Sequence, residues 1–249
     1  MQPRHRQILD YIRQHGDTAV DVLAKVLDVT AQTIRRDIRE LENAQVLARY
    51  HGGVGLPSTV QNIDYAQRLV MHVEAKRRIA QLVASQIEAG RSLILNLGTT
   101  TEEVSKALLQ HRGIRVVTNN LNVASILSDN QDAEVIVAGG VVRHRDRGIV
   151  GEATIDFMRQ FKVDIGIIGI SGIEEDGTLL DYDYSEVRVT QSIIEQSREV
   201  WLVADHTKFS RRALVRLGHI SQVTKFFTDA AIPISAQDAF AGVQVIVAQ

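Results

Sequence analysis

The chain has 249 residues, of which 45% are hydrophobic and 23% charged, with a formal net charge of -2. These values are typical of a globular protein with one large or two ordinary domains, and the overall charge does not indicate a nucleic-acid partner. Cysteine is absent, which excludes disulfides and thiol catalysis, and no apolar run of signal-peptide or membrane-span length occurs, so we expect a soluble cytoplasmic protein without a membrane partner.

The first part of the chain has the apolar spacing of short helices. Residues 4–14 repeat apolar side chains on one side, which predicts a helix with one buried face. Residues 18–20 indicate a short extended piece, and Asp21 is a suitable N-cap for a second helix. A tight turn at residues 28–29 then leads to a third helix.

The third helix is predicted over residues 30–40, TAQTIRRDIRE, with Thr30 as its N-cap. At about 100° per residue the side chains separate into two stripes. The apolar stripe consists of Ile34, Ile38 and Leu41. The polar stripe consists of Gln32, Arg35, Arg36 and Arg39. An amide can bond an adenine edge, and guanidinium groups can bond guanine edges or phosphates, so the polar stripe predicts a DNA recognition helix.

An alternative is that these arginines form an ordinary solvated face, with Asp37 and Glu40 as partners one helical turn away. The first 56 residues hold 8 Lys and Arg against 7 Asp and Glu, so any DNA signal lies in the placement of the arginines and not in bulk charge. The turn before the helix and a hairpin after it favour DNA recognition over the alternative.

That hairpin is predicted from an extended segment at residues 47–50 followed by the glycine pair at residues 52–53. Arg49 and His51 lie at its tip, from which they can reach a phosphate or the minor groove. Helix, helix, turn, helix and hairpin is the order of a winged helix-turn-helix domain, which we assign to residues 1–56.

Residues 30–53, TAQTIRRDIRELENAQVLARYHGG, resemble the DNA-binding domain of DeoR-type bacterial repressors. The resemblance rests on the TIRRDI core and on the L-x-R-x-HGG wing that follows it. It implies that the side chains at the major groove of a double-stranded operator are Gln32, Thr33, Arg35, Arg36 and Arg39. With these, the predicted DNA-binding residues include Thr30 at the start of the helix and Arg49 and His51 in the wing.

The second part of the chain begins after a polar stretch without clear period, residues 57–72, which we predict to be a linker. A long helix is predicted over residues 73–87, and Gly90 ends it. Apolar strand-like segments then alternate with helical stretches, at residues 93–97, 116–118, 134–138, 163–170, 200–204, 226–227 and 243–247. Strands that are apolar throughout predict an α/β domain over residues 73–249, with a parallel sheet covered on both faces.

Ligands of such sheets bind beyond the carboxyl ends of the strands. The GTTT segment at residues 98–101 lies at such an end and before a helix, where backbone N–H groups and hydroxyls can hold a phosphate. The alternative is a plain helix cap, in which Glu102 and Glu103 complement the helix dipole in place of a ligand. On this segment alone the two interpretations have equal weight.

Other polar residues at neighbouring strand ends favour a pocket: Thr118, Asn119, Asn120, Gly139 and Gly140. Asp205 and Lys208 add a carboxylate and an ammonium group three residues apart, and the ammonium can meet a phosphate as a point charge. An isolated pair at this spacing is usually a surface salt bridge, which stays open as the alternative.

The second domain also resembles the DeoR family, over its whole length. The resemblance is carried by TNNLNVA at residues 118–124, GEATIDF at 151–157, GISGI at 169–173, DYDYSEVRV at 181–189 and ADHTKF at 204–209. It implies a Rossmann-like sensor domain, similar in fold to ribose-5-phosphate isomerase and the CoA transferases. It also implies an effector site lined by Gly98, Thr99, Thr100, Thr101, Asn119, Asn120, Gly139, Gly140, Ser171, Glu186, Asp205 and Lys208.

Within the family these motifs most resemble members that respond to glycerol 3-phosphate. The resemblance therefore implies a repressor of genes for glycerol or glycerol 3-phosphate use, which binds an operator as a homo-oligomer, dimer or tetramer, and is released by this small phosphorylated effector. A repressor that answers to a different sugar phosphate is the first alternative.

An enzyme similar to a sugar-phosphate isomerase is the second alternative. Asp181, Asp183 and Glu186 are possible bases. In the related isomerases, however, acids occupy the loop that in this chain is GISGI, which disfavours catalysis. We expect no metal and no cofactor, because the eight histidines include no pair at metal-ligand spacing with a supporting acid. The HRDR segment at residues 144–147 is interpreted as a basic loop.

Overall fold

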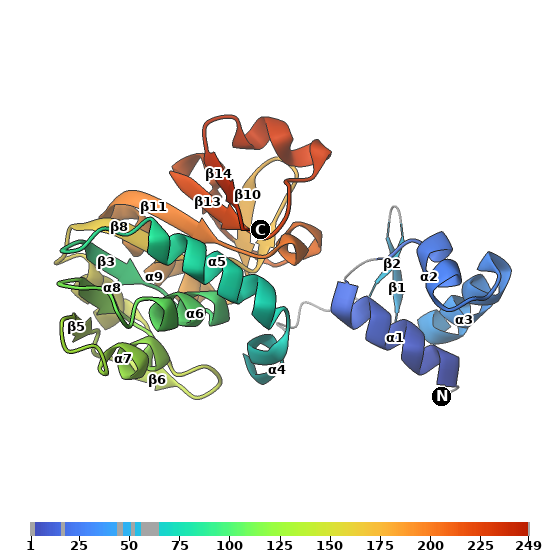
Figure 1. The fold of residues 1–249 in the computed structure, drawn as a ribbon, viewed down its shortest axis with the longest axis horizontal. Coiled ribbons are helices and arrows are strands. Elements are labelled where there is room, and N and C mark those ends of the chain that lie inside the picture. The colour runs from blue at the N-terminus through green and yellow to red at the C-terminus, as the bar shows by residue number, and fades with distance from the viewer. Residues whose placement is uncertain (1–2, 16–17, 44–46, 51–52, 56–64, 249) are drawn as a thin grey trace. The chain divides into compact units, whose positions relative to one another are not determined.

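The computed structural model describes residues 3–15, 18–43, 47–50, 53–55 and 65–248. The chain divides into two compact units, Met1–Gln61 and Asn62–Gln249, whose helices and strands are drawn in Figure 1. Each unit has an apolar core of its own. Among the described helices, none is both long enough and apolar enough to cross a membrane.

The smaller unit consists of three helices and a two-stranded hairpin: α1 (Pro3–His15), α2 (Val20–Val26), α3 (Ala31–Asn43), β1 (Ala48–Tyr50) and β2 (Gly53–Gly55). The apolar positions of each helix fall on one side and meet in a common core of Ile8, Leu9, Ile12, Leu23, Ile34, Ile38, Leu41, Leu47 and Val54. This is the predicted order of a winged helix-turn-helix domain.

Local contacts set the turns of this unit. Thr30 caps α3 as predicted, since its Oγ1 accepts a hydrogen bond at 3.2 Å from the backbone N–H three residues later. The prediction that Asp21 caps α2 is wrong. The N-cap is Ala19, and Asp21 lies in the first turn, where its charge complements the helix dipole. Gly53 is required in the wing, because a Cβ there would lie 2.7 Å from the carbonyl oxygen of Thr18.

A seven-stranded parallel sheet forms the centre of the larger unit, in the order β14-β13-β11-β8-β3-β4-β5. Its strands are β3 (Ser92–Leu95), β4 (Arg115–Thr118), β5 (Glu134–Val137), β8 (Val163–Ile168), β11 (Ser197–Val203), β13 (Lys225–Thr228) and β14 (Gln244–Val247). The alternating strands and helices and the parallel sheet predicted from the sequence are confirmed.

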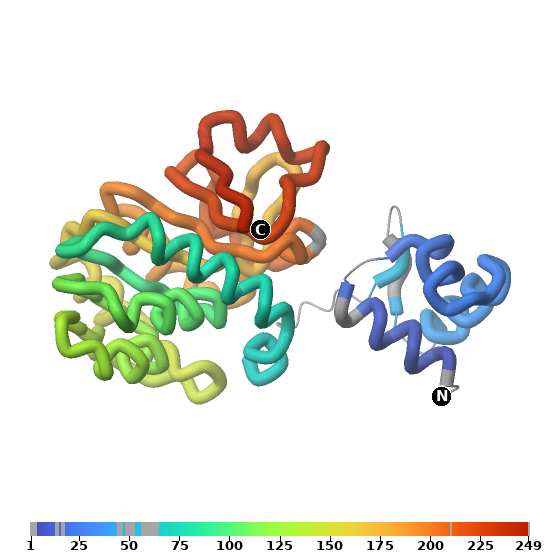
Figure 2. The backbone as a smooth tube through the Cα atoms, viewed as in Figure 1, coloured from blue at the N-terminus to red at the C-terminus, as the bar shows by residue number. Residues whose placement is uncertain are grey.

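Helices cover both faces of this sheet, and Figure 2 follows the backbone through the layers. One face packs against α5 (Val73–Ser85), α6 (Thr99–Ala107) and α7 (Leu121–Leu127), and the other against α8 (Glu152–Met158) and α9 (Tyr184–Glu195). Leu93 and Leu95 belong to the first layer, whereas Ile94 between them belongs to the second. Each strand is apolar throughout because successive side chains enter cores on opposite faces.

Shorter elements, which the sequence does not predict, surround the carboxyl ends of the strands. They are the hairpin of β6 (Val141–Arg143) and β7 (Gly148–Val150), the antiparallel strands β9 (Gly172–Ile173), β10 (Thr178–Asp181) and β12 (Val215–His219), and the 3-10 helices η1 (His206–Ser210), η2 (Ile220–Gln222) and η3 (Ile234–Phe240). The helix α4 (Tyr65–Val70) lies within residues 57–72, where the sequence predicts a linker. None of its residues is buried, which explains why its sequence shows no apolar period.

Candidate functional site

One face of α3 is free of the core. The exposed side chains on it are Gln32, Arg35, Arg36 and Arg39. Those buried beneath the helix are Ile34, Ile38 and Leu41. Thr33 is half-buried, and its hydroxyl lies 2.9 Å from that of the capping Thr30. The apolar stripe thus anchors the helix and leaves the predicted DNA-binding stripe exposed.

Asp37 does not pair with these arginines. Its side chain is buried and accepts a hydrogen bond at 3.0 Å from Nη2 of Arg4 on α1, and this pairing lowers the pKa of Asp37. Glu40 does pair with Arg36, with 3.4 Å between Oε1 and Nε. Neither Arg35 nor Arg39 forms an ion pair with another described residue. Of the two partners that the solvated-face alternative names, Glu40 is thus paired with an arginine of α3, whereas Asp37 is not.

The wing is described only in part. Arg49 lies in β1 opposite Val54 of β2. His51 lies outside the described residues. DNA contacts of both side chains remain predictions.

In the larger unit a pocket opens beyond the carboxyl ends of β3, β8 and β11, where the sequence predicts a ligand site. Its open space, which is continuous with solvent, is about 380 Å³. The predicted effector residues that line it are Gly98, Thr99, Thr100, Ser171, Glu186 and Lys208. The remaining lining residues are Arg68, Leu97, Gly169, Ile170, Asp181 and Val203.

The loop between β3 and α6 forms one wall of the pocket. Gly98 is the N-cap of α6 and has a φ of 142°, a conformation that side chains rarely adopt. The backbone N–H groups at such a helix start suit an anion. Thr101 supports the loop from behind, since its hydroxyl donates to the carbonyl oxygen of Asn96 at 2.8 Å. Thr99 and Thr100 are thus the hydroxyls that line the pocket.

Basic side chains gather at the pocket. Lys208 from η1 and Arg68 from α4 line it. Burial lowers the pKa of Lys208 to about 7, and the charge of Arg211 contributes to this shift. The carboxylate of Asp205 acts in the opposite direction. Burial also lowers the pKa of Lys76 to about 8. Buried positive charges that repel one another are unfavourable without an anion, so the pocket is suited to bind one.

Asp205 is the N-cap of η1 and lies beside the pocket lining. Its Oδ1 accepts a hydrogen bond at 3.1 Å from the backbone N–H of Thr207. Burial raises the pKa of Asp205, but Lys208, Thr207 and Arg211 outweigh burial and lower it to about 2. The carboxylate therefore stays ionised, and its charge favours the protonated form of Lys208.

Two carboxyl groups also line the pocket. Asp181 is buried and accepts a hydrogen bond at 2.9 Å from the Ser171 hydroxyl, and burial raises its pKa. Burial and the neighbouring Asp181 raise the pKa of Glu186 to about 7, although Arg143 opposes this. Carboxyl groups and a hydroxyl are suitable partners for the hydroxyl groups of a polyol.

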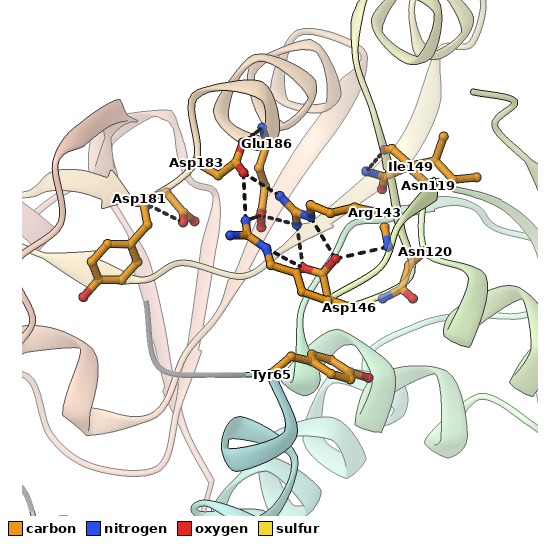
Figure 3. A network of polar contacts seen from close by, with 12 residues as sticks. Tyr65, Asn119, Asn120, Arg143, Asp146, Ile149, Asp181, Asp183 and Glu186 are labelled. Atoms are coloured by element: carbon orange, nitrogen blue, oxygen red, sulfur yellow. Dashed lines mark hydrogen bonds and ion pairs between the residues drawn. The ribbon is translucent and has the colours of Figure 1, made fainter. Parts of the chain in front are cut away.

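Arg143, from the unpredicted hairpin, holds Glu186 in place (Figure 3). Its guanidinium group lies 2.7 Å from Glu186, 2.9 Å from Asp183 and 2.5 Å from Asp146. Asp183 also caps α9, and Arg145 lies 2.8 Å from it. Residues 144–147 are therefore not simply a basic loop, because this segment carries a buried carboxylate and belongs to an ion-pair network beside the pocket.

Besides Thr101 and Asp205, four more predicted effector residues lie outside the pocket lining. The buried Asn119 donates from Nδ2 to the carbonyl oxygen of Ile149 at 3.1 Å, as labelled in Figure 3. Asn120 caps α7, with its Oδ1 accepting a backbone hydrogen bond at 2.9 Å. Gly139 and Gly140 follow β5 and are exposed. Asn120 thus bonds the nearby backbone as a helix cap, whereas the buried Oδ1 of Asn119 has no hydrogen-bond partner among the described residues.

Sequence reasoning missed Arg68 and Arg143 and considered Asp181 only as a possible base. Arg68 lies in the predicted linker, and Arg143 precedes the segment interpreted as a basic loop. The described residues contain no cluster of histidine and acidic side chains that could hold a metal ion.

Two family models match the chain. Residues 4–60 match a DeoR-like helix-turn-helix domain, and residues 71–230 match a DeoR C terminal sensor domain. The chain therefore belongs to the DeoR family, and the resemblance in both of its parts is confirmed.

Relatives of high identity share one name. The chain is 49% identical over 232 residues to the glycerol-3-phosphate regulon repressor of Escherichia coli (strain K12), with 93% of this chain and 92% of the relative covered. It is 48% identical to the protein of that name from Haemophilus influenzae, with 90% and 88% covered. A solved D-ribose-5-phosphate isomerase is 14% identical, with a TM-score of 0.42 over 55% of this chain and 54% of the isomerase.

Proposed function

We propose that this chain is a transcriptional repressor of genes for glycerol or glycerol 3-phosphate use. Helix α3 binds operator DNA, and glycerol 3-phosphate in the pocket releases the protein. The observation that carries the proposal is a pocket in which Lys208 and a helix start lie together with carboxyl groups. The shared name of the high-identity relatives supports this effector.

The pocket chemistry fits a small polyol phosphate. The phosphate binds the start of α6, the hydroxyls of Thr99 and Thr100 and the ammonium group of Lys208. Asp181 and Glu186 then accept hydrogen bonds from the carbon-bound hydroxyl groups. The Ser171 hydroxyl, which donates to Asp181, orients that carboxylate.

The proposal includes a symmetric homo-oligomer, dimer or tetramer, in the cytoplasm. The DNA-binding part, residues 1–56, has a net charge of only +1 and should bind DNA weakly as a single copy. Residues 57–72 connect it to the sensor, residues 73–249. Two copies read an inverted repeat with half-sites about 34 Å apart. Effector binding favours an arrangement that no longer matches this spacing, with a coupling of about 1–3 kcal/mol.

Thermal denaturation with candidate ligands tests the effector. Glycerol 3-phosphate at 100 times its Kd is expected to raise the Tm of the sensor transition by about 5–10 °C, because it binds only the folded state. Fructose and ribose phosphates serve as matched controls. If they stabilise the protein and glycerol 3-phosphate does not, the chain is a repressor for a different sugar phosphate.

A sugar-phosphate isomerase-like enzyme is the second candidate, because Glu186 lines the pocket and has a pKa of about 7, a value suited to a general base. Arg143 argues against this enzyme function. It donates a hydrogen bond to the Glu186 carboxylate at 2.7 Å and so makes that carboxylate a weaker acceptor for a substrate proton. Incubation of the protein with pentose and triose phosphates should give no turnover. Measurable isomerisation that Glu186→Gln abolishes would make the chain an enzyme.

Effector affinity should depend on pH. The Lys208 amine has a pKa of about 7 in the free protein, and a bound phosphate favours its protonated form. Binding above pH 7 therefore takes up a proton, and affinity falls as pH rises from 7 to 8.5, by up to about tenfold per unit. Ionisation of Glu186 near pH 7 acts in the same direction.

Calorimetric titrations with glycerol 3-phosphate between pH 6.5 and 8.5 measure this dependence. Repeating them in buffers of different ionisation enthalpy gives the number of protons taken up on binding. Lys208→Arg, which keeps its charge throughout this range, should leave only the part of the pH dependence that Glu186 contributes. Constant affinity of the unaltered protein across this range would show that neither group titrates in the pocket.

A further inference from the structure

Helix α4 brings an arginine from outside the sheet into the pocket. Arg68 lines the pocket together with Lys208 and Gly98. Its Nε is buried and has no hydrogen-bond partner among the described residues. An unpaired buried donor of a guanidinium group is costly unless a ligand accepts from it. An anion in the pocket supplies such an acceptor.

The position of α4 depends on polar contacts. None of its residues is buried, so no apolar core of its own holds it. Lys76 of α5, itself buried, donates from Nζ to the backbone carbonyl oxygen of Arg68. The guanidinium carbon of Arg68 lies 5.8 Å from the centre of the Tyr65 ring. A six-residue helix held in this way is stable only while those contacts persist.

Tyr65 connects α4 to the helix whose start lines the pocket. Its hydroxyl donates to Oε2 of Glu102 on α6 at 2.7 Å and accepts from Nδ2 of Asn122 at 2.8 Å. Nδ2 of Asn120 donates to the other oxygen of Glu102 at 3.2 Å. Glu102 is buried, and burial and this carboxylate raise the pKa of Tyr65. Figure 3 labels Tyr65 below Asn120 and the Arg143 network.

Positive charge gathers where α4 meets the pocket. Burial has the largest effect on the pKa of Lys208 and lowers it, and the charges of Arg211 and Arg68 lower it further. Burial and the charge of Arg68 also lower the pKa of Lys76. The carboxylate of Asp205 opposes both shifts. A bound anion therefore attracts Arg68 as well as Lys208, and in doing so it acts on α4.

We propose that Arg68 binds the anionic group of the effector, and that α4, anchored to α6 through Tyr65, transmits occupancy of the pocket toward the DNA-binding unit. Along the chain α4 lies near the start of the larger unit, which begins at Asn62 and follows the unit that contains α3. Effector binding restrains Arg68 within α4. The hydrogen bond of Tyr65 with Glu102 holds the first residue of α4 to α6, so the restraint acts on the whole helix. This inference rests on the proposed function.

Arg68→Gln tests the ligand role, with Arg78→Gln on the exposed face of α5 as its matched control. Arg68→Gln should weaken glycerol 3-phosphate binding by about 10- to 100-fold, because a charged hydrogen bond is lost. Its operator affinity without effector should stay within about threefold of the parent protein. Arg78→Gln should change neither value. Circular dichroism melts establish that each variant is folded.

Tyr65→Phe tests the transmitting role, because it removes one hydroxyl that lies outside the pocket lining. Tyr184→Phe, at an exposed tyrosine of α9, is its control. Tyr65→Phe should keep effector affinity and effector-free operator affinity within about threefold. The ratio of operator affinities without and with saturating effector should fall toward 1 from the roughly 5- to 150-fold expected for such coupling.

Inorganic phosphate, measured by thermal shift, separates failure of this inference from failure of the proposed function. If Arg68→Gln binds both glycerol 3-phosphate and phosphate as the parent protein does, the role of Arg68 is overturned and the proposed function stands. If Tyr65→Phe responds normally, the role of α4 is overturned. If the parent protein ignores glycerol 3-phosphate but binds phosphate through Arg68, the effector is wrong and the ligand role holds. If it binds neither, both proposals fail.

Discussion

Replacing Arg35 and Arg36 together by alanine is expected to weaken operator binding by at least about 100-fold, while the affinity for glycerol 3-phosphate stays unchanged. Both side chains are exposed on α3, and the apolar stripe beneath them is buried in the core. Each substitution removes one contact per copy, so a symmetric dimer loses each contact twice. Fluorescence anisotropy with labelled operator at constant salt concentration measures the effect.

The single variants distinguish the two kinds of contact. Loss of a phosphate contact lowers the salt dependence of binding and weakens all sequences alike, whereas loss of a base contact relaxes the sequence preference at one position. Arg78→Ala, on the exposed face of α5, is the control and should bind operator normally. Unchanged operator affinity in the double variant would show that α3 does not read DNA.

Lys208→Ala is expected to leave operator binding intact and to abolish its response to effector at ordinary concentrations. The ammonium group lines the pocket beside the start of α6, and losing its charged hydrogen bond to phosphate should weaken effector binding by about 10- to 100-fold. Titration of the protein–operator complex with glycerol 3-phosphate measures the response.

Two control variants show whether the loss of response depends on the charge and the position of Lys208. Lys208→Arg keeps a cation beside Asp205 and should retain part of the response, whereas Lys162→Ala removes an exposed lysine and should retain all of it. Release of Lys208→Ala from operator at the parental effector concentration would show that the effector binds elsewhere.

The periodic parts of the fold follow from the sequence. The apolar stripe of α3 predicts both its burial and the exposure of its arginines, because one helical face has to pack. The strands β3 and β8 are apolar throughout, which predicts a sheet buried on both faces. From such a sheet, the placement of Gly98, Ser171 and Lys208 at one edge follows, since the carboxyl ends of parallel strands meet there.

Contacts that depend on tertiary structure do not follow from the sequence. Thr101 has the right residue type and position for a ligand, but its hydroxyl donates to nearby backbone carbonyl oxygens instead. Asn119 donates from Nδ2 to the backbone of a distant hairpin, a contact that its sequence position does not reveal. Arg68 enters the pocket from a helix without an apolar face, so periodicity gives no sign of it. Asp37 lies among arginines in the sequence, yet Arg4 from a different helix pairs with it.

Electrophoretic mobility shift of the operator, with and without glycerol 3-phosphate, tests the central claim most directly. The protein should bind the operator without effector, and saturating glycerol 3-phosphate should raise its operator Kd by the roughly 5- to 150-fold expected for such coupling. At a protein concentration near the effector-free operator Kd, most of the bound DNA should then be released. Ribose 5-phosphate at the same concentration should not. A complex that persists at saturating glycerol 3-phosphate, with saturation established by calorimetry, would contradict the proposed function.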